Sequence, residues 1–158
     1  MREAIGGTWL FGLVITFIVF FASFLAISVN FSKAFNVKNN VVDLISKYEG
    51  NNCNARKNIG KYLNDVGYLV TGECKNVDGV TYTAYDLNGN KVSGTKGYYC
   101  VAIEDTGSST DINKTYYRVM VFFRVDLPVI GNLTTFKIKG ETESIYYASD
   151  ESNKTTCS

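Results

Sequence analysis

A long uncharged segment near the N-terminus constrains the fold of this chain more than any other feature. No charged residue occurs from Ala4 to Ser32, and the centre of this run, Trp9 to Val29, consists mainly of Phe, Leu, Ile and Val. An α-helix needs about 20 apolar residues to cross the hydrocarbon core of a bilayer. The segment is therefore predicted to be a membrane-spanning helix, with Trp9 near one membrane–water interface.

A cleaved signal peptide is the alternative interpretation of the same segment. Ala26-Ile27-Ser28 has the small-x-small pattern of a cleavage site. The apolar region is, however, longer than the roughly 7–15 residues that signal peptides use. An uncleaved anchor is favoured for that reason, whereas cleavage near Ser28 would leave a secreted domain.

The helix is expected to continue beyond the membrane. Neither glycine nor proline lies between Gly12 and Gly50. Beyond the uncharged run, four apolar residues follow the i, i+3, i+4, i+7 spacing of one helical face: Val41, Leu44, Ile45 and Tyr48. Gly50 then stands at a natural C-cap position. We therefore predict one helix from Thr8 to Glu49, whose amphipathic half covers the protein's own sheet.

The four cysteines indicate which side of the membrane the rest of the chain occupies. All of them follow the uncharged segment: Cys53, Cys74, Cys100 and Cys157. An even number in a small domain behind a membrane segment predicts two disulfides, which persist in an oxidising compartment. A metal site is disfavoured because the chain has no CxxC pair and no histidine. The N-terminus is thus predicted to be cytoplasmic and the C-terminal domain extracellular.

Four cysteines allow three pairings, and one of them is favoured. Cys74 and Cys100 lie in or beside neighbouring predicted strands, which favours a bond between them. The polar tail over 150–158 has no other tether, which favours Cys53–Cys157. The other two pairings remain open from the sequence.

The part of the chain after residue 50 is predicted to be mostly β. A short helix fits Cys53–Val66 and is closed by Gly67. Period-two alternation then predicts five strands: Tyr68–Cys74, Val80–Asp86, Tyr98–Glu104, Thr115–Leu127 and Thr134–Tyr147. Asn88-Gly89 is a hairpin signal that joins the second strand to 91–93.

The strand from 115 to 127 predicts how the sheet packs. Its odd-numbered positions are apolar from Tyr117 to Leu127, whereas Arg118, Arg124 and Asp126 point the other way. One apolar and one polar face are typical of an antiparallel sheet covered by a helix on one side. The fold class is therefore α+β. It divides into an N-terminal segment and transmembrane helix over 1–32, an amphipathic continuation over 33–50, and an extracytoplasmic disulfide-bonded β-rich domain over 51–158.

Composition argues against an enzyme. The chain contains no histidine, the commonest general base and metal ligand, and its formal net charge is +1. That charge provides no basic face for nucleic acid. Asp86–Asn90 begins like a calcium loop, but Lys91 replaces the required glycine and Gly97 the terminal glutamate. We predict no catalytic residue, no cofactor, no metal site and no nucleic-acid partner.

Glu3 is an acidic residue at the start of an apolar helix, where it would be costly in lipid unless paired. One interpretation places its carboxylate at the membrane surface, which is favourable near a helix N-terminus. The other is a contact with the N-terminal amine of a neighbouring subunit in a helical filament.

The two ends of the chain resemble a known class of proteins. The features are Met1-Arg2-Glu3-Ala4-Ile5-Gly6-Gly7 ahead of the apolar helix, and a strand–Pro–strand ending through Tyr117–Phe123, Leu127–Gly131 and Phe136–Thr142. This arrangement resembles the type IV pilin-like proteins, and more narrowly the TadE-like minor pilins (pseudopilins) of tight-adherence secretion systems in Gram-positive bacteria.

The resemblance implies a structural function. The chain would be a subunit of a type IV pilus-like surface filament or secretion system, with its N-terminal helix as membrane anchor and then filament core. Its partners would be the membrane, other pilin-like subunits and the pilus assembly machinery. The implied subunit contacts are Glu3, Trp9, Phe17, Phe21 and Phe24. The alternative is a monomeric membrane-tethered module for extracellular binding or adhesion.

Overall fold

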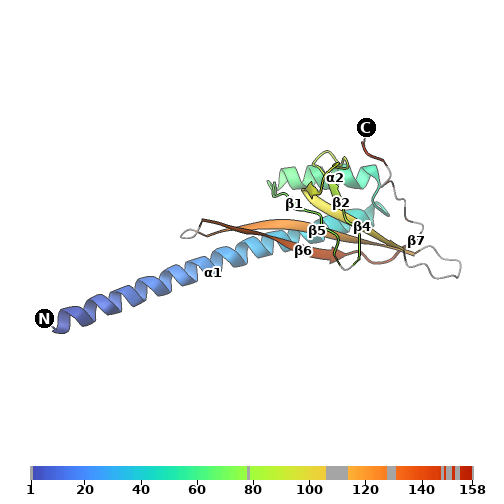
Figure 1. Ribbon diagram of the computed structural model, residues 1–158. Helices are drawn as coiled ribbons and strands as arrows, with labels where there is room; N and C mark the ends of the chain where they lie inside the picture. The colour runs from blue at the N-terminus through green and yellow to red at the C-terminus, as the bar shows by residue number, and fades with distance from the viewer. Residues whose placement is uncertain are drawn as a thin grey trace.

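A single long helix carries a small α+β domain on its C-terminal half (Figure 1). The structure is a computed structural model that describes residues 2–77, 79–105, 114–127, 131–146, 148, 151 and 154–157. The N-terminal half of the helix extends away from the domain, and none of its described side chains is buried. The α+β fold class predicted from the sequence is confirmed.

The long helix, α1, spans Arg2–Lys47 without a break, so it begins six residues before the predicted Thr8 and ends two before Glu49. Its continuity beyond Gly12 is as the absence of glycine and proline there predicts. The backbone N–H of Gly50 donates to the carbonyl of Ile45 over 2.9 Å. In this helix-ending motif the preceding residue takes the left-handed conformation. That residue is Glu49, at φ 54°, so the expectation that Gly50 supplies the left-handed cap was wrong.

The second helix, α2, spans Cys53–Asp65 and runs back along α1 (Figure 1). The side-chain oxygen of Asn52 accepts from the backbone N–H of Ala55 at its N-terminus, over 2.9 Å. At the other end Gly67 has φ 67°, and the N–H of Tyr68 donates to the carbonyl of Leu63. The predicted helix and its glycine stop are both present.

The main sheet is antiparallel, with the strand order β2-β4-β5-β6, and β7 also pairs with β5. Its strands are β2 Thr83–Tyr85, β4 Tyr99–Asp105, β5 Lys114–Leu127, β6 Gly131–Glu141 and β7 Ile145–Tyr146. A separate two-stranded sheet pairs β1 Gly72–Glu73 with β3 Lys96–Gly97. Strand β5 is therefore the central strand of the sheet, because it pairs with β4, β6 and β7.

The predicted strand over 134–147 is divided into β6 and β7, which lie in sequence along the same edge of β5. The division occurs at Thr142, which is buried. Its hydroxyl oxygen accepts from the backbone N–H of Tyr117 over 3.0 Å, and its own N–H donates to the carbonyl of Tyr117. A side chain thus replaces one backbone acceptor of the ladder, which interrupts the strand.

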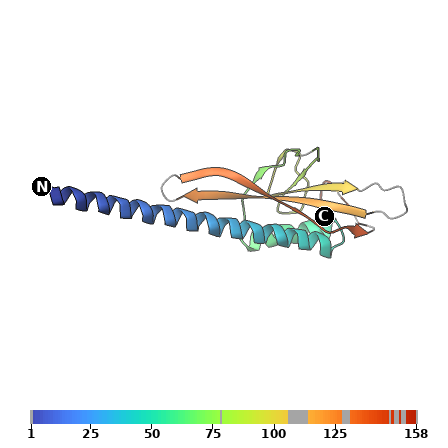
Figure 2. The ribbon, with the colours of Figure 1, turned by 90° about the horizontal axis from the view of Figure 1, so that it is seen from below.

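One face of the sheet packs against both helices, as Figure 2 shows. The buried side chains from α1 and α2 are Ala34, Val37, Val41, Ile45, Ile59 and Leu63. Those from the sheet are Tyr85, Tyr99, Val101, Tyr117, Val119, Val121 and Phe123. The prediction that the amphipathic half of α1 covers the sheet is confirmed.

Helix α1 also lies close to β6, and Gly140 makes this approach feasible. A Cβ atom at Gly140 would lie 2.5 Å from Cδ of Lys38 and 3.2 Å from Cγ2 of Val42. Any larger residue would push the helix away from the sheet or force Lys38 to move.

The opposite face of the sheet is not simply polar, which corrects the sequence prediction. Met120 and Phe122 are buried there in a second core with Cys74, Tyr82, Ala84, Cys100 and Ala102. The chain between α2 and β4 crosses this face, and the Cys74–Cys100 disulfide fastens it there. This crossing also explains why the predicted strands over 68–74 and 80–86 shorten to Gly72–Glu73 and Thr83–Tyr85.

The segment over 86–90 forms the expected turn. Oδ1 of Asp86 accepts from the backbone N–H groups of Asn88 and Asn90, over 2.9 and 2.7 Å. Gly89 has φ 78°, and residues 85 and 91 form a single bridge. Since the return segment over 91–93 makes only that bridge, it is not a full strand. The carboxylate of Asp86 is engaged in the turn itself.

Candidate membrane and subunit interface

The candidate functional surface is the N-terminal half of α1. From Gly7 to Lys33 no side chain is buried against the rest of the chain. Many of these side chains are large and apolar, and leaving one such residue in water costs roughly 1.5–3 kcal/mol relative to burial. This half of the helix therefore requires an apolar environment that the chain itself does not provide.

Length and composition make α1 suitable for crossing a membrane, and it is the one such helix in the described part of the chain. Its apolar residues surround the helix instead of forming a single stripe, a pattern typical of a lipid-embedded helix. The helix is thus a candidate membrane anchor, as the sequence predicts.

Two hydroxyl side chains in this half are satisfied within the helix. The hydroxyl of Thr16 donates to the carbonyl of Gly12 over 2.9 Å. The Ser23 hydroxyl does the same to Val19 over 2.9 Å. In lipid, where no water is at hand, such back-bonding removes the cost of an unpaired donor.

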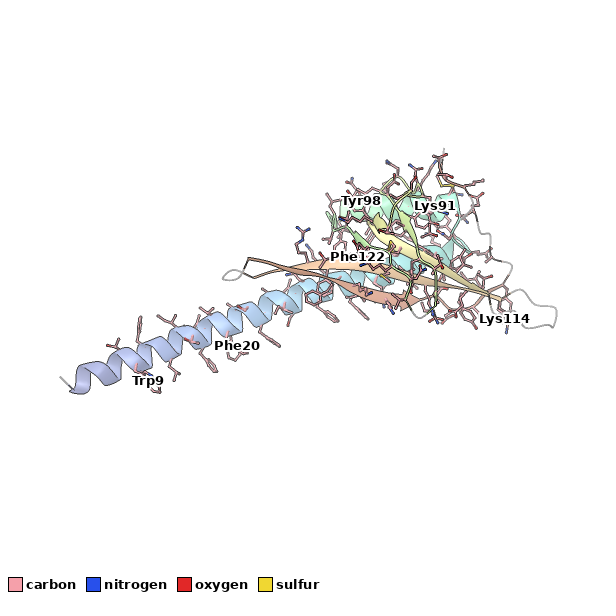
Figure 3. The ribbon with its side chains drawn as sticks, in the orientation of Figure 1. Trp9, Phe20, Lys91, Tyr98, Lys114 and Phe122 are labelled. Atoms are coloured by element: carbon pink, nitrogen blue, oxygen red, sulfur yellow. A yellow bond between two sulfur atoms is a disulfide. The ribbon has the colours of Figure 1, made fainter. Side chains whose placement is uncertain are left out.

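The four predicted contact residues whose side chains are described are exposed. Trp9 is 73% exposed, Phe17 60%, Phe21 50% and Phe24 59%. The i, i+4, i+7 spacing places Phe17, Phe21 and Phe24 in one stripe, and the rings of Phe17 and Phe21 lie 4.9 Å apart. Figure 3 shows Trp9 and, further along, Phe20 pointing away from the domain. Glu3 lies in α1, but its side chain is outside the described residues.

A shallow groove runs beside this stripe and was not singled out from the sequence. Thr8, Gly12 and Thr16 lie along it, with Phe17 at its side. No atom lies within 4 Å of where a Cβ atom on Gly12 would be, so a second helix has room to approach there. Small residues four apart are typical of closely packed membrane helices, and this spacing was the signal in the sequence.

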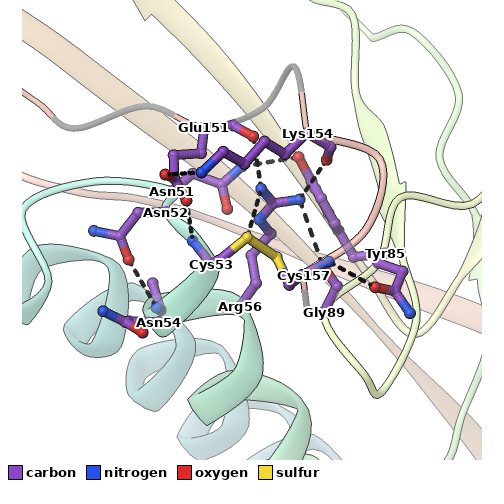
Figure 4. Close-up of a disulfide and its surroundings, with 12 residues drawn as sticks. Asn51, Asn52, Cys53, Asn54, Arg56, Tyr85, Gly89, Glu151, Lys154 and Cys157 are labelled. Carbon is purple, nitrogen blue, oxygen red and sulfur yellow. Dashed lines mark hydrogen bonds and ion pairs between the residues drawn. A yellow bond between two sulfur atoms is a disulfide. The ribbon is translucent and has the colours of Figure 1, made fainter.

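The far end of the domain is held by a disulfide and a buried arginine (Figure 4). Cys53, at the start of α2, is bonded to Cys157. The fully buried guanidinium of Arg56 donates to the carbonyl oxygens of Glu151 and Lys154, over 2.6 and 3.0 Å. It also lies over the ring of Tyr85, 5.2 Å from its centroid.

These contacts tie the C-terminal tail to α2. The carboxylate of Glu151 accepts from the backbone N–H of Cys53 over 3.0 Å. Its hydrogen bond with Lys154, and then that with Cys53, hold the pKa of Glu151 below its usual value. Arg56 was not predicted from the sequence. It occupies the same stripe of α2 as Ile59 and Leu63, and that position was the available signal.

All four cysteines are engaged in disulfides. The second disulfide joins Cys74 to Cys100, so the structure has the pairing that the sequence favours, and no cysteine is free. Among the described residues there is no group of three or more metal-ligating side chains. What the arrangement provides is a large exposed apolar surface on a rigid support.

Comparison with known protein families, with curated proteins and with solved structures finds no significant match. The molecule has a long apolar N-terminal helix packed on an antiparallel sheet that carries two disulfides. This architecture is consistent with a pilin-like protein.

Proposed function

We propose that this chain is a structural subunit, a minor pilin or pseudopilin, of a type IV pilus-like surface filament or secretion system. The observation that carries the proposal is the apolar half of α1, whose large side chains are exposed instead of packed in the domain. It belongs to the same unbroken helix that packs on the domain. A subunit that moves from a bilayer to a filament core needs such a helix, because both environments are apolar.

The packing of the C-terminal half supports this function physically. Ala34, Val37, Val41 and Ile45 are all buried against the sheet or α2. The direction of the apolar half relative to the domain is therefore set by the fold. Neighbouring subunits could then place their helices side by side in the filament core and their domains on its surface.

The two disulfides support an extracytoplasmic position for the domain. Both join residues that follow the apolar segment, and disulfides persist in oxidising compartments. With one membrane span, the N-terminus would then be cytoplasmic. The subunit would be a single-pass membrane protein until it enters an extracellular filament.

Cysteine cross-linking tests the proposal directly. Since every native cysteine is paired, Phe17→Cys or Phe24→Cys introduces a single free thiol into the apolar helix. Cells that express the variant together with the filament assembly machinery are treated with an oxidant, which joins neighbouring thiols. Surface filaments are then sheared off and separated from the membranes. We expect cross-linked multimers in the sheared fraction for both variants.

The control is Lys61→Cys, on the exposed side of α2. Since the helix core makes the contacts in this proposal, it should cross-link much less. If the protein stays in the membrane fraction as a monomer with every thiol position, the chain is a membrane-tethered binding module and the filament proposal is wrong.

A further inference from the structure

A small pocket of about 230 Å³ lies where α1 leaves its apolar run. Three parts of the chain form it: α1 with Lys33, the segment after α2 with Tyr68 and Leu69, and β5 with Phe123 and Arg124. Figure 1 shows the C-terminal end of α2 and the paired ends of β5 and β6 on the side of the domain that faces the N-terminal half of α1. The pocket is thus at the membrane-proximal end of the domain.

The position of the pocket along α1 matches the headgroup layer of a bilayer. If Trp9 to Val29 fills the hydrocarbon core, Lys33 lies four residues further, or about 6 Å along the helix axis. The polar layer on each side of the core is roughly 5–7 Å thick. Lys33 is also the first charged residue after the uncharged run.

Two cations face this pocket without a partner of their own. Neither Lys33 nor Arg124 makes an ion pair with any described residue, and both side chains are exposed. Arg118, on the same strand as Arg124, instead pairs with Glu104 over 2.8 Å and with Glu141 over 3.6 Å. The positive charge at the membrane-proximal end is therefore left for an external anion.

A buried tyrosine forms part of the pocket wall. Tyr68 is 8% exposed, and its side chain belongs to the core between the helices and the sheet. Burial raises the pKa of its hydroxyl, so Tyr68 stays protonated and adds no negative charge beside the two cations.

Apolar side chains flank the polar groups of the pocket. Leu69 is 53% exposed, and Phe31, which lies between the pocket residues Asn30 and Lys33 on α1, is 52% exposed. Exposure of these apolar side chains to water is unfavourable, whereas the boundary between lipid headgroups and acyl chains suits them. A ligand with an anionic group next to an apolar chain fits this combination.

We propose that the pocket binds the phosphate of an anionic phospholipid headgroup. Lys33 and Arg124 pair with the phosphate oxygens, and Leu69 contacts the start of the acyl chains. The proposal rests on the membrane-anchor part of the proposed function but not on filament assembly. Free inorganic phosphate could make the same contacts with Lys33 and Arg124, so the test must distinguish a lipid phosphate from inorganic phosphate.

The test uses the purified full chain in a neutral detergent. Binding is measured for three probes: dihexanoyl phosphatidylglycerol, dihexanoyl phosphatidylcholine and inorganic phosphate. We expect saturable binding of the phosphatidylglycerol, at least about tenfold tighter than that of the zwitterionic lipid or of phosphate. Equal affinity for phosphatidylcholine would overturn the anionic specificity, and equal affinity for inorganic phosphate would overturn the assignment to a lipid.

Variants then locate the binding. Lys33→Gln combined with Arg124→Gln should weaken phosphatidylglycerol binding by roughly tenfold or more, since it removes two charge-assisted contacts.

Lys57→Gln combined with Lys61→Gln removes the same charge from the exposed side of α2 and serves as the matched control. An equal loss in this control would show non-specific charge attraction and overturn the proposal. So would wild-type binding by the variant that lacks the charges of Lys33 and Arg124. Because purified subunits are used, the result does not depend on whether filaments form.

Discussion

The ring of Phe31 on α1 meets the ring of Phe123 on β5 edge to face, with their centroids 6.0 Å apart. Phe136, on β6, stacks on the same Phe123 ring at 5.4 Å. The contact lies where α1 passes from its apolar half to the half that packs on the sheet. Phe123 therefore links the membrane-proximal part of the helix to two strands of the domain.

Phe123→Ala should destabilise the domain by about 3–5 kcal/mol, the usual cost of removing a buried aromatic side chain. The control is Phe136→Ala, because Phe136 is 46% exposed and should cost clearly less. The free energy of unfolding of the full chain in neutral detergent measures both. Equal losses would show that the contact with Phe31 adds nothing.

The Cys53–Cys157 disulfide joins residues 104 apart, and Cys74–Cys100 joins residues 26 apart. In the chain-entropy model, closing the longer loop stabilises by about 4–5 kcal/mol and the shorter loop by about 3–4 kcal/mol. Replacing each pair by alanines should therefore cost more for the longer loop, as measured by denaturant unfolding. The opposite order would indicate that the tail is held mainly by other contacts, Arg56 first among them.

Arg56→Met should release the C-terminal tail while leaving α2 folded. The carbonyls of Glu151 and Lys154 would lose their donors, at about 1–3 kcal/mol for each buried group left unpaired. Hydrogen exchange in 151–157 should rise, whereas exchange in β5 should change little. Lys57→Met, at an exposed neighbouring position, is the control and should leave the exchange of the tail unchanged.

Local sequence patterns were sufficient to predict the long helix and the central strand. Helix α1 was predicted because no breaker interrupts it beyond Gly12, and β5 because its alternation is strong. The second core was missed because Met120 and Phe122 share a face of β5 with Arg118 and Arg124, whose charges predict a polar face. Their burial depends on a cover from a distant part of the chain, fastened at Cys74.

Arg56 was missed for the same physical reason. An arginine in a helix is normally solvated, and its burial here depends on carbonyls 95 and 98 residues further along the chain. The membrane-proximal pocket likewise combines Lys33, Tyr68 and Arg124 from three separate elements. No local pattern links such positions.

Glu151 gives the tail a dependence on pH. Its pKa lies below the usual 4.5 because of the Lys154 hydrogen bond first and the Cys53 N–H second. A lowered pKa in the folded state stabilises fold and tail at pH values above the unfolded pKa, and this stabilisation is lost as the pH falls through the lowered value. Between about pH 6 and about pH 3, Glu151→Gln should lose less stability than the wild type.

Glu73→Gln provides the comparison, because Lys75 lowers the pKa of Glu73 at a site far from the tail. Unfolding curves across the same pH range measure all three proteins. In addition, hydrogen exchange at the amide of Cys53, corrected for its intrinsic pH dependence, should lose protection on acidification in the wild type and in Glu73→Gln. No such loss in the wild type would mean that the Glu151 carboxylate does not hold the start of α2.

A charge in the middle of the apolar half should remove the protein from the membrane. Val19→Asp places a carboxylate near the centre of the run, at about 2.5–3.5 kcal/mol on insertion scales. The matched control is Val66→Asp, since Val66 is 38% exposed at the end of α2 and Val19 is 39% exposed. Carbonate-washed membranes should retain the Val66 variant and lose the Val19 variant, while both keep their two disulfides. Retention of Val19→Asp in membranes and in surface filaments would show that the apolar half of α1 is neither the anchor nor the filament core.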